Sequence, residues 1–167
     1  DDMIAAAKAT GRKLGVAHVA RIGVRHIKQA ITEGAVGDLF RMLWTSYAAR
    51  SNGYYRAAEW RGKWLTEGGG VLINQCIHDM DALQWLCGPV VEVRALLDNL
   101  EHDVEVEDIG SAALRFASGA IGAFEVGLCT LPQLSRREFA GDLGIIVSDE
   151  QGTRIGKLSF PVRQYLH

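Results

Sequence analysis

Cysteine is scarce in this sequence, and its scarcity limits the class of protein that the chain can be. Only three of the 167 residues are cysteines, at Cys76, Cys87 and Cys129. They are odd in number and lie among apolar residues, which argues against a disulfide scaffold and is typical of buried thiols in a reducing compartment. We therefore expect a cytoplasmic protein.

Clusters of one charge and long apolar runs are missing as well. The 18 Lys and Arg residues are balanced by 20 Asp and Glu residues, for a net charge of −2. No basic cluster marks a face for nucleic acid or an anionic membrane. No apolar run approaches the roughly 18 residues of a membrane span, and no stretch has the pattern of a signal peptide. We therefore expect neither a nucleic-acid partner nor a membrane partner.

What remains is the composition of an ordinary globular protein. Apolar residues make up 48% of the chain and charged residues 23%, as in typical globular domains. A length of 167 residues suits one domain with a core of its own, or one domain plus part of another.

The first 22 residues favour the second of these possibilities. Residues 2–9 are strong helix formers followed by Gly11, and residues 13–20 have the composition of a short apolar strand. Helix, glycine and strand in this order form the second half of a crossover between parallel strands. The neighbouring strands are not in this sequence, so we expect a fragment in which residues 1–22 are the remnant of an N-terminal dinucleotide-binding domain.

From residue 23 onwards the pattern predicts a C-terminal α+β domain, truncated or complete, over 23–167. A helix is expected near 24–32, a long alternating strand follows from Gly37, and an irregular stretch with a short helix covers 51–66. Further strands are expected near 90–98, 109–116, 120–129, 136–148 and 153–160. Their short connections favour antiparallel neighbours, which predicts an open, mainly antiparallel sheet with helices on one face.

One stretch, 68–88, carries the candidate chemistry. It begins with three glycines and ends at a Gly-Pro pair, and its centre is predicted to form one helix over 71–87 that covers the sheet. Asn74, His78 and Asp81 fall at positions i, i+4 and i+7, which places them in one row on that helix. A polar row beside a broad apolar surface needs partners, and these are either other side chains or a substrate.

Seven short motifs follow one another along the chain. They are Trp60-Arg61, Gly68-Gly69-Gly70, His78 with Asp81, Trp85 before Gly88, Glu107-Asp108, Ser118-Gly119-Ala120, and Gly141 with Gly144. Each motif is weak alone. In this order they resemble the Gfo/Idh/MocA family of nicotinamide-dependent oxidoreductases, specifically the end of its Rossmann domain followed by its C-terminal α+β domain. The resemblance extends to about Glu150.

The resemblance implies an NAD(P)-dependent dehydrogenase that oxidises or reduces a sugar, inositol or related polyol. It also implies a homodimer or homotetramer formed through the sheet, and NAD or NADP bound mainly by the N-terminal domain. Neither the glycine-rich dinucleotide fingerprint nor the Glu-Lys-Pro motif with the family's lysine occurs in this sequence. We therefore expect this chain alone to be inactive.

The same resemblance implies the site residues. His78 matches the family's catalytic histidine, and Asn74 stands where an aspartate is usual. An amide does not exchange a proton near neutral pH, so Asn74 is expected to bind and orient the substrate without acting as acid or base. Trp60, Arg61 and Asp81 are expected to bind substrate.

Arg21 is a further candidate, suggested by its position in the chain. It ends the predicted strand of the remnant, where ligands collect in open α/β folds, and it is expected to contact the cofactor. No metal site is expected, because His78, Asp79 and Asp81 reproduce no known metal-binding spacing and the other histidines are scattered.

Each candidate has a structural alternative. His78 can be a core histidine bonded to a backbone carbonyl, Asn74 a polar contact on the helix surface, and Asp81 an anchor for a loop or for His78. Trp60 and Arg61 can be a surface cation–π pair. For the whole chain, the alternative is a non-catalytic dimerisation domain derived from the same family. A carbonyl reductase or dehalogenating enzyme on the same scaffold would differ only in substrate.

Overall fold

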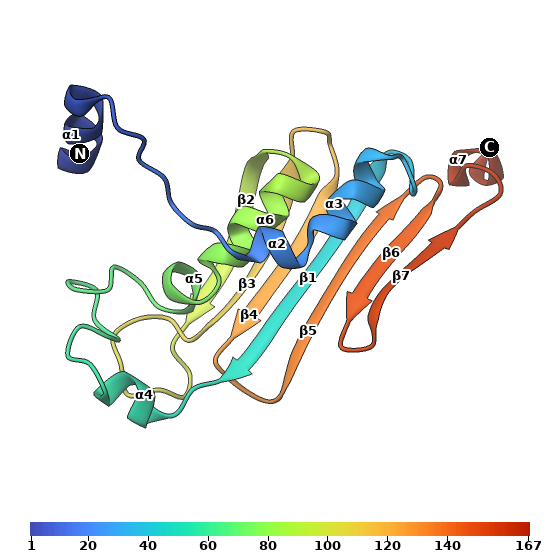
Figure 1. Cartoon of the computed structure of the whole chain (residues 1–167). Helices are drawn as coiled ribbons and strands as arrows, with labels where there is room; N and C mark the ends of the chain where they lie inside the picture. Colours follow the sequence, from blue (N-terminus) through green and yellow to red (C-terminus); the bar gives the residue numbers. More distant parts are fainter.

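The computed structural model describes residues 1–167, and its centre is a seven-stranded sheet (Figure 1). The strands are β1 (Leu39–Ala49), β2 (Val90–Asp98), β3 (Ile109–Phe116), β4 (Ile121–Gly127), β5 (Cys129–Gly141), β6 (Gly144–Asp149) and β7 (Gly152–Lys157). Their order in space is β2-β3-β4-β1-β5-β6-β7, and only β1 and β4 run parallel. The predicted open, mainly antiparallel sheet is confirmed.

Seven helices accompany the sheet. They are α1 (Asp2–Thr10), α2 (Ala20–Gly23), α3 (Arg25–Thr32), α4 (Asn52–Arg56), α5 (Val71–Asn74), α6 (Ile77–Cys87) and α7 (Val162–Leu166). Figure 1 shows α2, α3 and α6 on one face of the sheet, as predicted, and α1 standing apart from it. The longest helix has 11 residues, and none combines the length and the apolar character that a membrane crossing requires.

The core lies between the sheet and the helices α3 and α6. Alternation along β1 turns Met42 and Trp44 toward the helices, and the Trp44 ring meets Phe139 of β5 edge to face, with centroids 6.4 Å apart. Helix α6 contributes Leu83 and Leu86 to the same cluster. A fully buried side chain of this size contributes about 1.5–3 kcal/mol, so this packing fixes α6 on the sheet.

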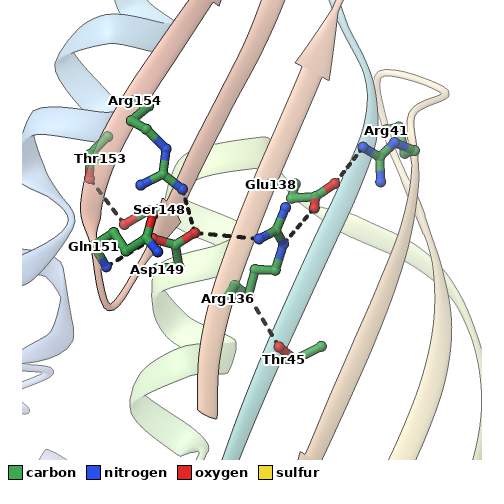
Figure 2. Close-up of polar contacts among 9 residues, drawn as sticks. All are labelled: Arg41, Thr45, Arg136, Glu138, Ser148, Asp149, Gln151, Thr153 and Arg154. Carbon is green, nitrogen blue, oxygen red and sulfur yellow. Dashed lines mark hydrogen bonds and ion pairs between the residues drawn. The ribbon is translucent and has the colours of Figure 1, made fainter.

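The opposite face of the sheet carries a ladder of ion pairs, shown in Figure 2. Glu138 accepts hydrogen bonds from Arg41 and Arg136, each at 2.7 Å, and Asp149 accepts from Arg136 and Arg154. These arginines hold the pKa of both carboxyl groups below the usual range. The ladder ties β1, β5, β6 and β7 together across the face that the helices leave open.

Two predicted strands are wrong. Residues 12–18 have no regular structure, because no strand of the chain lies beside them, and α2 begins already at Ala20. The predicted strand over 136–148 is the hairpin of β5 and β6. It reverses after Gly141, where Leu143 N donates to Val36 O at 2.9 Å and the backbone is drawn away from the strand direction.

The predicted helix over 71–87 is also wrong in its continuity, because it is divided into α5 and α6. Cys76 N donates to Val71 O at 2.8 Å, a bond to the fifth preceding residue, which closes a wider turn than that of an α-helix. α6 starts anew at Ile77. Asn74 and His78 therefore lie on two different helices, and the single polar row expected from the sequence does not form.

The end of α6 agrees with the sequence. It stops at Cys87 because Gly88 has a φ of 89°, which residues with side chains rarely adopt, and because Pro89 cannot continue a helix. With a ψ of −174°, Gly88 leads directly into β2.

The three glycines before α5 allow a close contact between two backbone segments. Val71 N donates to the carbonyl oxygen of Glu107 at 3.0 Å, and Leu72 N donates to Glu107 Oε1 at 3.2 Å. A Cβ atom on Gly70 would lie only 1.9 Å from the same carbonyl oxygen. The absence of a side chain at Gly70 is therefore required for packing, and no phosphate is needed to explain it.

Replacing Gly70 with alanine is expected to lower the free energy of unfolding by about 3 kcal/mol, the upper part of the range for overpacking. The obstacle is a backbone carbonyl, which cannot rotate away as a side chain can. Gly23→Ala is the matched control, because a Cβ there meets nothing within 4 Å. Urea unfolding curves measure both variants, and equal stabilities would contradict this account of the glycine run.

Candidate active site

His78 lies in the first turn of α6 and packs against a second histidine, His18. The two ring centroids are 5.6 Å apart and the rings are inclined at 72°. The Nδ1 atom of each ring is buried and makes no hydrogen bond. The Nε2 atom of His78 also makes no hydrogen bond within the chain but is not among the buried atoms, so it is the nitrogen that a ligand can reach.

Arg21 and Asp81 form an ion pair next to this ring contact. Arg21 Nε donates to Asp81 Oδ2 and Nη2 donates to Oδ1, both at 2.6 Å. These hydrogen bonds lower the pKa of Asp81 and raise that of Arg21. Both carboxylate oxygens of Asp81 are occupied, and the two residues predicted to bind different ligands are bound to each other. We call His18, Arg21, His78 and Asp81 the α2–α6 cluster.

Asn74 belongs to a different group. Its Nδ2 donates to Glu67 Oε1, and Glu67 Oε2 accepts a hydrogen bond from the backbone N–H of Gly62 at 2.5 Å. Glu67 therefore connects α5 to the loop that contains Arg61. The amide oxygen of Asn74 makes no hydrogen bond within the chain and is the free acceptor of this group.

Trp60 and Arg61 form a stack with Tyr54. The Arg61 guanidinium lies 4.1 Å from the centroid of the Tyr54 ring and 5.1 Å from that of Trp60, and it donates to the carbonyl oxygen of Tyr54 at 3.1 Å. Trp60 remains 46% exposed. Arg61 also lines a groove of about 450 Å³ between α4 and the loop at 103–105. The cation–π pair weighed from the sequence is thus present, and it leaves one aromatic face open. We call Trp60, Arg61, Glu67 and Asn74 the loop cluster.

Sequence reasoning missed two features near His78. One is His18, whose signal is its spacing: it precedes Arg21 by three residues, as His78 precedes Asp81. The other is Asp79, which lies 3.9 Å from Arg137 on the core side of α6. Burial raises the pKa of Asp79, opposed by Arg137, and burial lowers the pKa of Arg137. This pair holds α6 to β5 beneath the candidate site.

Asp108 closes the loop that follows β2. Its carboxylate accepts backbone N–H bonds from Leu100, Glu101 and His102 at 3.0–3.2 Å and a bond from His102 Nδ1 at 2.7 Å. Burial opposes ionisation, but these donors hold the pKa of Asp108 below its usual range. His102 Nε2 faces the carbonyl oxygen of Arg50 at 2.7 Å, so both ring nitrogens of His102 face oxygen atoms of the protein.

Asp108→Asn is expected to lower the free energy of unfolding by about 3 kcal/mol at neutral pH, because it leaves the buried His102 ring and three backbone N–H groups poorly paired. The folded pKa is depressed, so the ionised Asp108 stabilises the fold above its unfolded pKa of about 3.9 and loses this effect as the pH falls toward the folded value. The wild-type advantage over the variant should therefore shrink below about pH 4.

Chemical unfolding at several pH values measures this effect. The matched control is Asp103→Asn, which removes the same charge from an exposed position of the same loop and should change stability by less than about 0.5 kcal/mol. An Asp108→Asn loss that stays constant from pH 7 to pH 3 would show that ionisation of Asp108 is not its source.

No cluster of three His, Cys, Asp or Glu side chains is arranged to hold a metal ion. A model of the GFO/IDH/MocA C-terminal domain matches residues 24–147, which is most of the chain. The chain belongs to the Gfo/Idh/MocA family. This membership, expected from the ordered motifs, is confirmed together with the fold.

Named relatives agree with the family assignment. Over 162 residues the chain is 30% identical to a 1,5-anhydro-D-fructose reductase of Ensifer adhaerens, covering 93% of this chain and 45% of the reductase. A WlbA dehydrogenase of Bordetella pertussis, solved with NADH and UDP-GlcNAcA, is 34% identical with a TM-score of 0.84, covering 95% of this chain and 49% of that one. The chain spans about half the length of these family members.

A third relative shares the fold. An NAD-binding oxidoreductase of Klebsiella pneumoniae gives a TM-score of 0.81 at 23% identity, over 95% of this chain and 47% of its own. At this level of identity the likeness concerns the arrangement of the sheet and helices alone.

The candidate site has hydrogen-bonding groups for a small polar ligand, but no motif that binds a dinucleotide. His78 offers an open Nε2 and Asn74 an uncharged amide oxygen, which fit a neutral ligand with hydroxyl groups. The sequence contains no glycine-rich fingerprint for the cofactor's phosphates. The chain thus has groups that can face a substrate but none of the usual groups that bind a dinucleotide.

Proposed function

We propose that this chain is the C-terminal catalytic part of an NAD(P)-dependent oxidoreductase that oxidises or reduces a sugar, inositol or related polyol. The observation that carries the proposal is His78, whose Nε2 makes no hydrogen bond within the chain and is not among the buried atoms, while its ring packs against His18. Membership of a family of oxidoreductases supports it, as does the sugar chemistry named for the Ensifer reductase.

In the intact protein, the two parts of this chain would belong to two different domains. Residues 1–22 belong to the nicotinamide-binding domain and residues 23–167 to the substrate and oligomerisation domain. Support comes from α1, which stands apart from the sheet in Figure 1. NAD or NADP is held mainly outside this chain, which would therefore be inactive alone. The protein is cytoplasmic, in keeping with its three free cysteines.

The chemistry that a bound nicotinamide would supply is hydride exchange with the substrate carbon. His78 Nε2 takes the hydroxyl proton during oxidation or returns it during reduction, since an imidazole exchanges protons near neutral pH. The amide oxygen of Asn74 accepts a hydrogen bond from a neighbouring substrate hydroxyl and fixes its direction. Trp60 offers an exposed ring face to the sugar, while Arg61 is held behind it by Tyr54.

A nucleotide-linked sugar is a second candidate substrate. The Bordetella relative binds UDP-GlcNAcA. The groove beside Arg61 in this chain carries Arg56 and Lys63, which can meet phosphate oxygens, together with three carboxylates, Glu59, Asp103 and Glu105. Binding assays with a free sugar and with the same sugar linked to UDP separate the two candidates. A preference for the UDP-linked form that disappears at high salt would favour the second.

His78→Ala in the intact protein is expected to lower kcat by roughly 10²-fold or more, because the proton would lose its acceptor. The effect on kcat/KM should be of similar size, since the interaction is made in the transition state. Steady-state kinetics with the cofactor and a panel of polyols measure both. His26→Gln is the matched control, because His26 is exposed and its ring bonds Thr153 of β7 instead of any residue of the cluster.

The alternative of a non-catalytic dimerisation domain makes a different prediction. Analytical ultracentrifugation of this chain would show a stable dimer or tetramer through the open face of the sheet under either hypothesis. Only the non-catalytic domain predicts that the intact protein neither binds NAD(P) nor turns over any polyol. Near-normal turnover by His78→Ala would remove the catalytic role of this residue.

A further inference from the structure

In the α2–α6 cluster, a histidine precedes a charged residue by three positions in two places. His18 and Arg21 are three residues apart, and so are His78 and Asp81. Arg21 pairs with Asp81, and His18 contacts His78. The ion pair and the ring contact therefore both join residues 18–21 to α6, about one helical turn apart along α6.

The segment that carries His18 is anchored from its C-terminal side, where Ala20 packs against the core and Val24 is buried. Residues 12–18 form no ladder with any strand, and α2 has four residues, none of them buried. A helix this short is not stable alone, since isolated helices of fewer than about 12 residues are marginal in water. The position of His18 therefore depends on the contact between α2 and α6.

The Arg21–Asp81 pair has the geometry that such a contact needs. Single-contact ion pairs on a surface constrain little, whereas a guanidinium that donates two parallel hydrogen bonds fixes direction as well as distance. The Asp81 side chain is only 16% exposed. The Arg21 guanidinium also lies 5.6 Å from the centroid of the Trp85 ring, one helical turn farther along α6.

We propose that Arg21 and Asp81 are positioning residues whose ion pair holds the His18 ring against His78 and so fixes the direction of His78 Nε2. In this proposal Arg21 binds Asp81 and not the cofactor, and Asp81 binds Arg21 and not the substrate. The catalytic consequence rests on the proposed function, whereas the positioning is a property of this chain and can be measured without turnover.

The test is NMR on the 167-residue chain with labelled histidines. The wild-type chain is expected to give nuclear Overhauser contacts between the ring protons of His18 and His78. Arg21→Gln and Asp81→Asn should each abolish them, because each removes one side of the ion pair. Exchanging the two residues, Arg21→Asp with Asp81→Arg, should restore them, because the pair is rebuilt with reversed polarity.

The matched control is Arg41→Gln, which breaks an ion pair with Glu138 at 2.7 Å on the opposite face of the sheet (Figure 2). It should leave the His18–His78 contact unchanged. If the exchange variant does not fold, Arg21→Lys replaces it, since lysine keeps the charge but loses the two-bond geometry. A weakened ring contact is then expected.

Three results would overturn the proposal. The first is a ring contact that persists in folded Arg21→Gln and Asp81→Asn variants. The second is a folded exchange variant that fails to restore it. The third is a ring contact of wild-type strength in Arg21→Lys.

The intact protein links the positioning to catalysis. Arg21→Gln should lower kcat by up to roughly 10²-fold with little change in the KM for the cofactor, as expected when a reacting group is misplaced. A raised cofactor KM with an intact His18–His78 contact would return Arg21 to cofactor binding and contradict the positioning role. A protein without any turnover would contradict the proposed function alone, because the NMR result does not depend on it.

Discussion

The contact between the glycine run and Glu107 fixes the start of α5, the helix that carries Asn74 and leads into α6. Gly70 lies so close to the Glu107 carbonyl that no side chain fits there, and two successive N–H groups bond to that one residue. α5 is thereby held at the entry to β3, and the wide turn at Cys76 lets α6 start afresh against the sheet. His78 reaches the surface at this new start, with Leu83 and Leu86 buried beneath the same helix.

Much of this fold could be predicted from the sequence. Strands β2 and β3 have the predicted bounds, because alternation and turn signals are local properties. The break between α5 and α6 could not be predicted, since the composition of residues 71–87 is compatible with one helix and nothing in it marks the wide turn at Cys76. The segment 12–18 was misread for a related reason: apolar composition favours a strand, but a strand forms only where a neighbour supplies hydrogen bonds.

At the candidate site, too, single residues could be predicted from the sequence but contacts between distant residues could not. His78 and Asn74 could be chosen from the ordered motifs, and each offers an unpaired polar atom. The pairing of Arg21 with Asp81 was not predictable, because 60 residues separate the two in the chain. The result is a candidate site in two parts: the α2–α6 cluster, which contains His78, and the loop cluster, where Glu67 connects Asn74 to the loop of Trp60 and Arg61.

The central claim is that a substrate meets this chain at His78. The most direct measurement is a crystal structure of the intact protein with NADH and a bound sugar. We expect one sugar hydroxyl within hydrogen-bonding distance of His78 Nε2 and a second at the amide oxygen of Asn74. The ion pair between Arg21 and Asp81 should remain intact. A sugar bound elsewhere, with His78 Nε2 turned into the protein, would contradict the central claim.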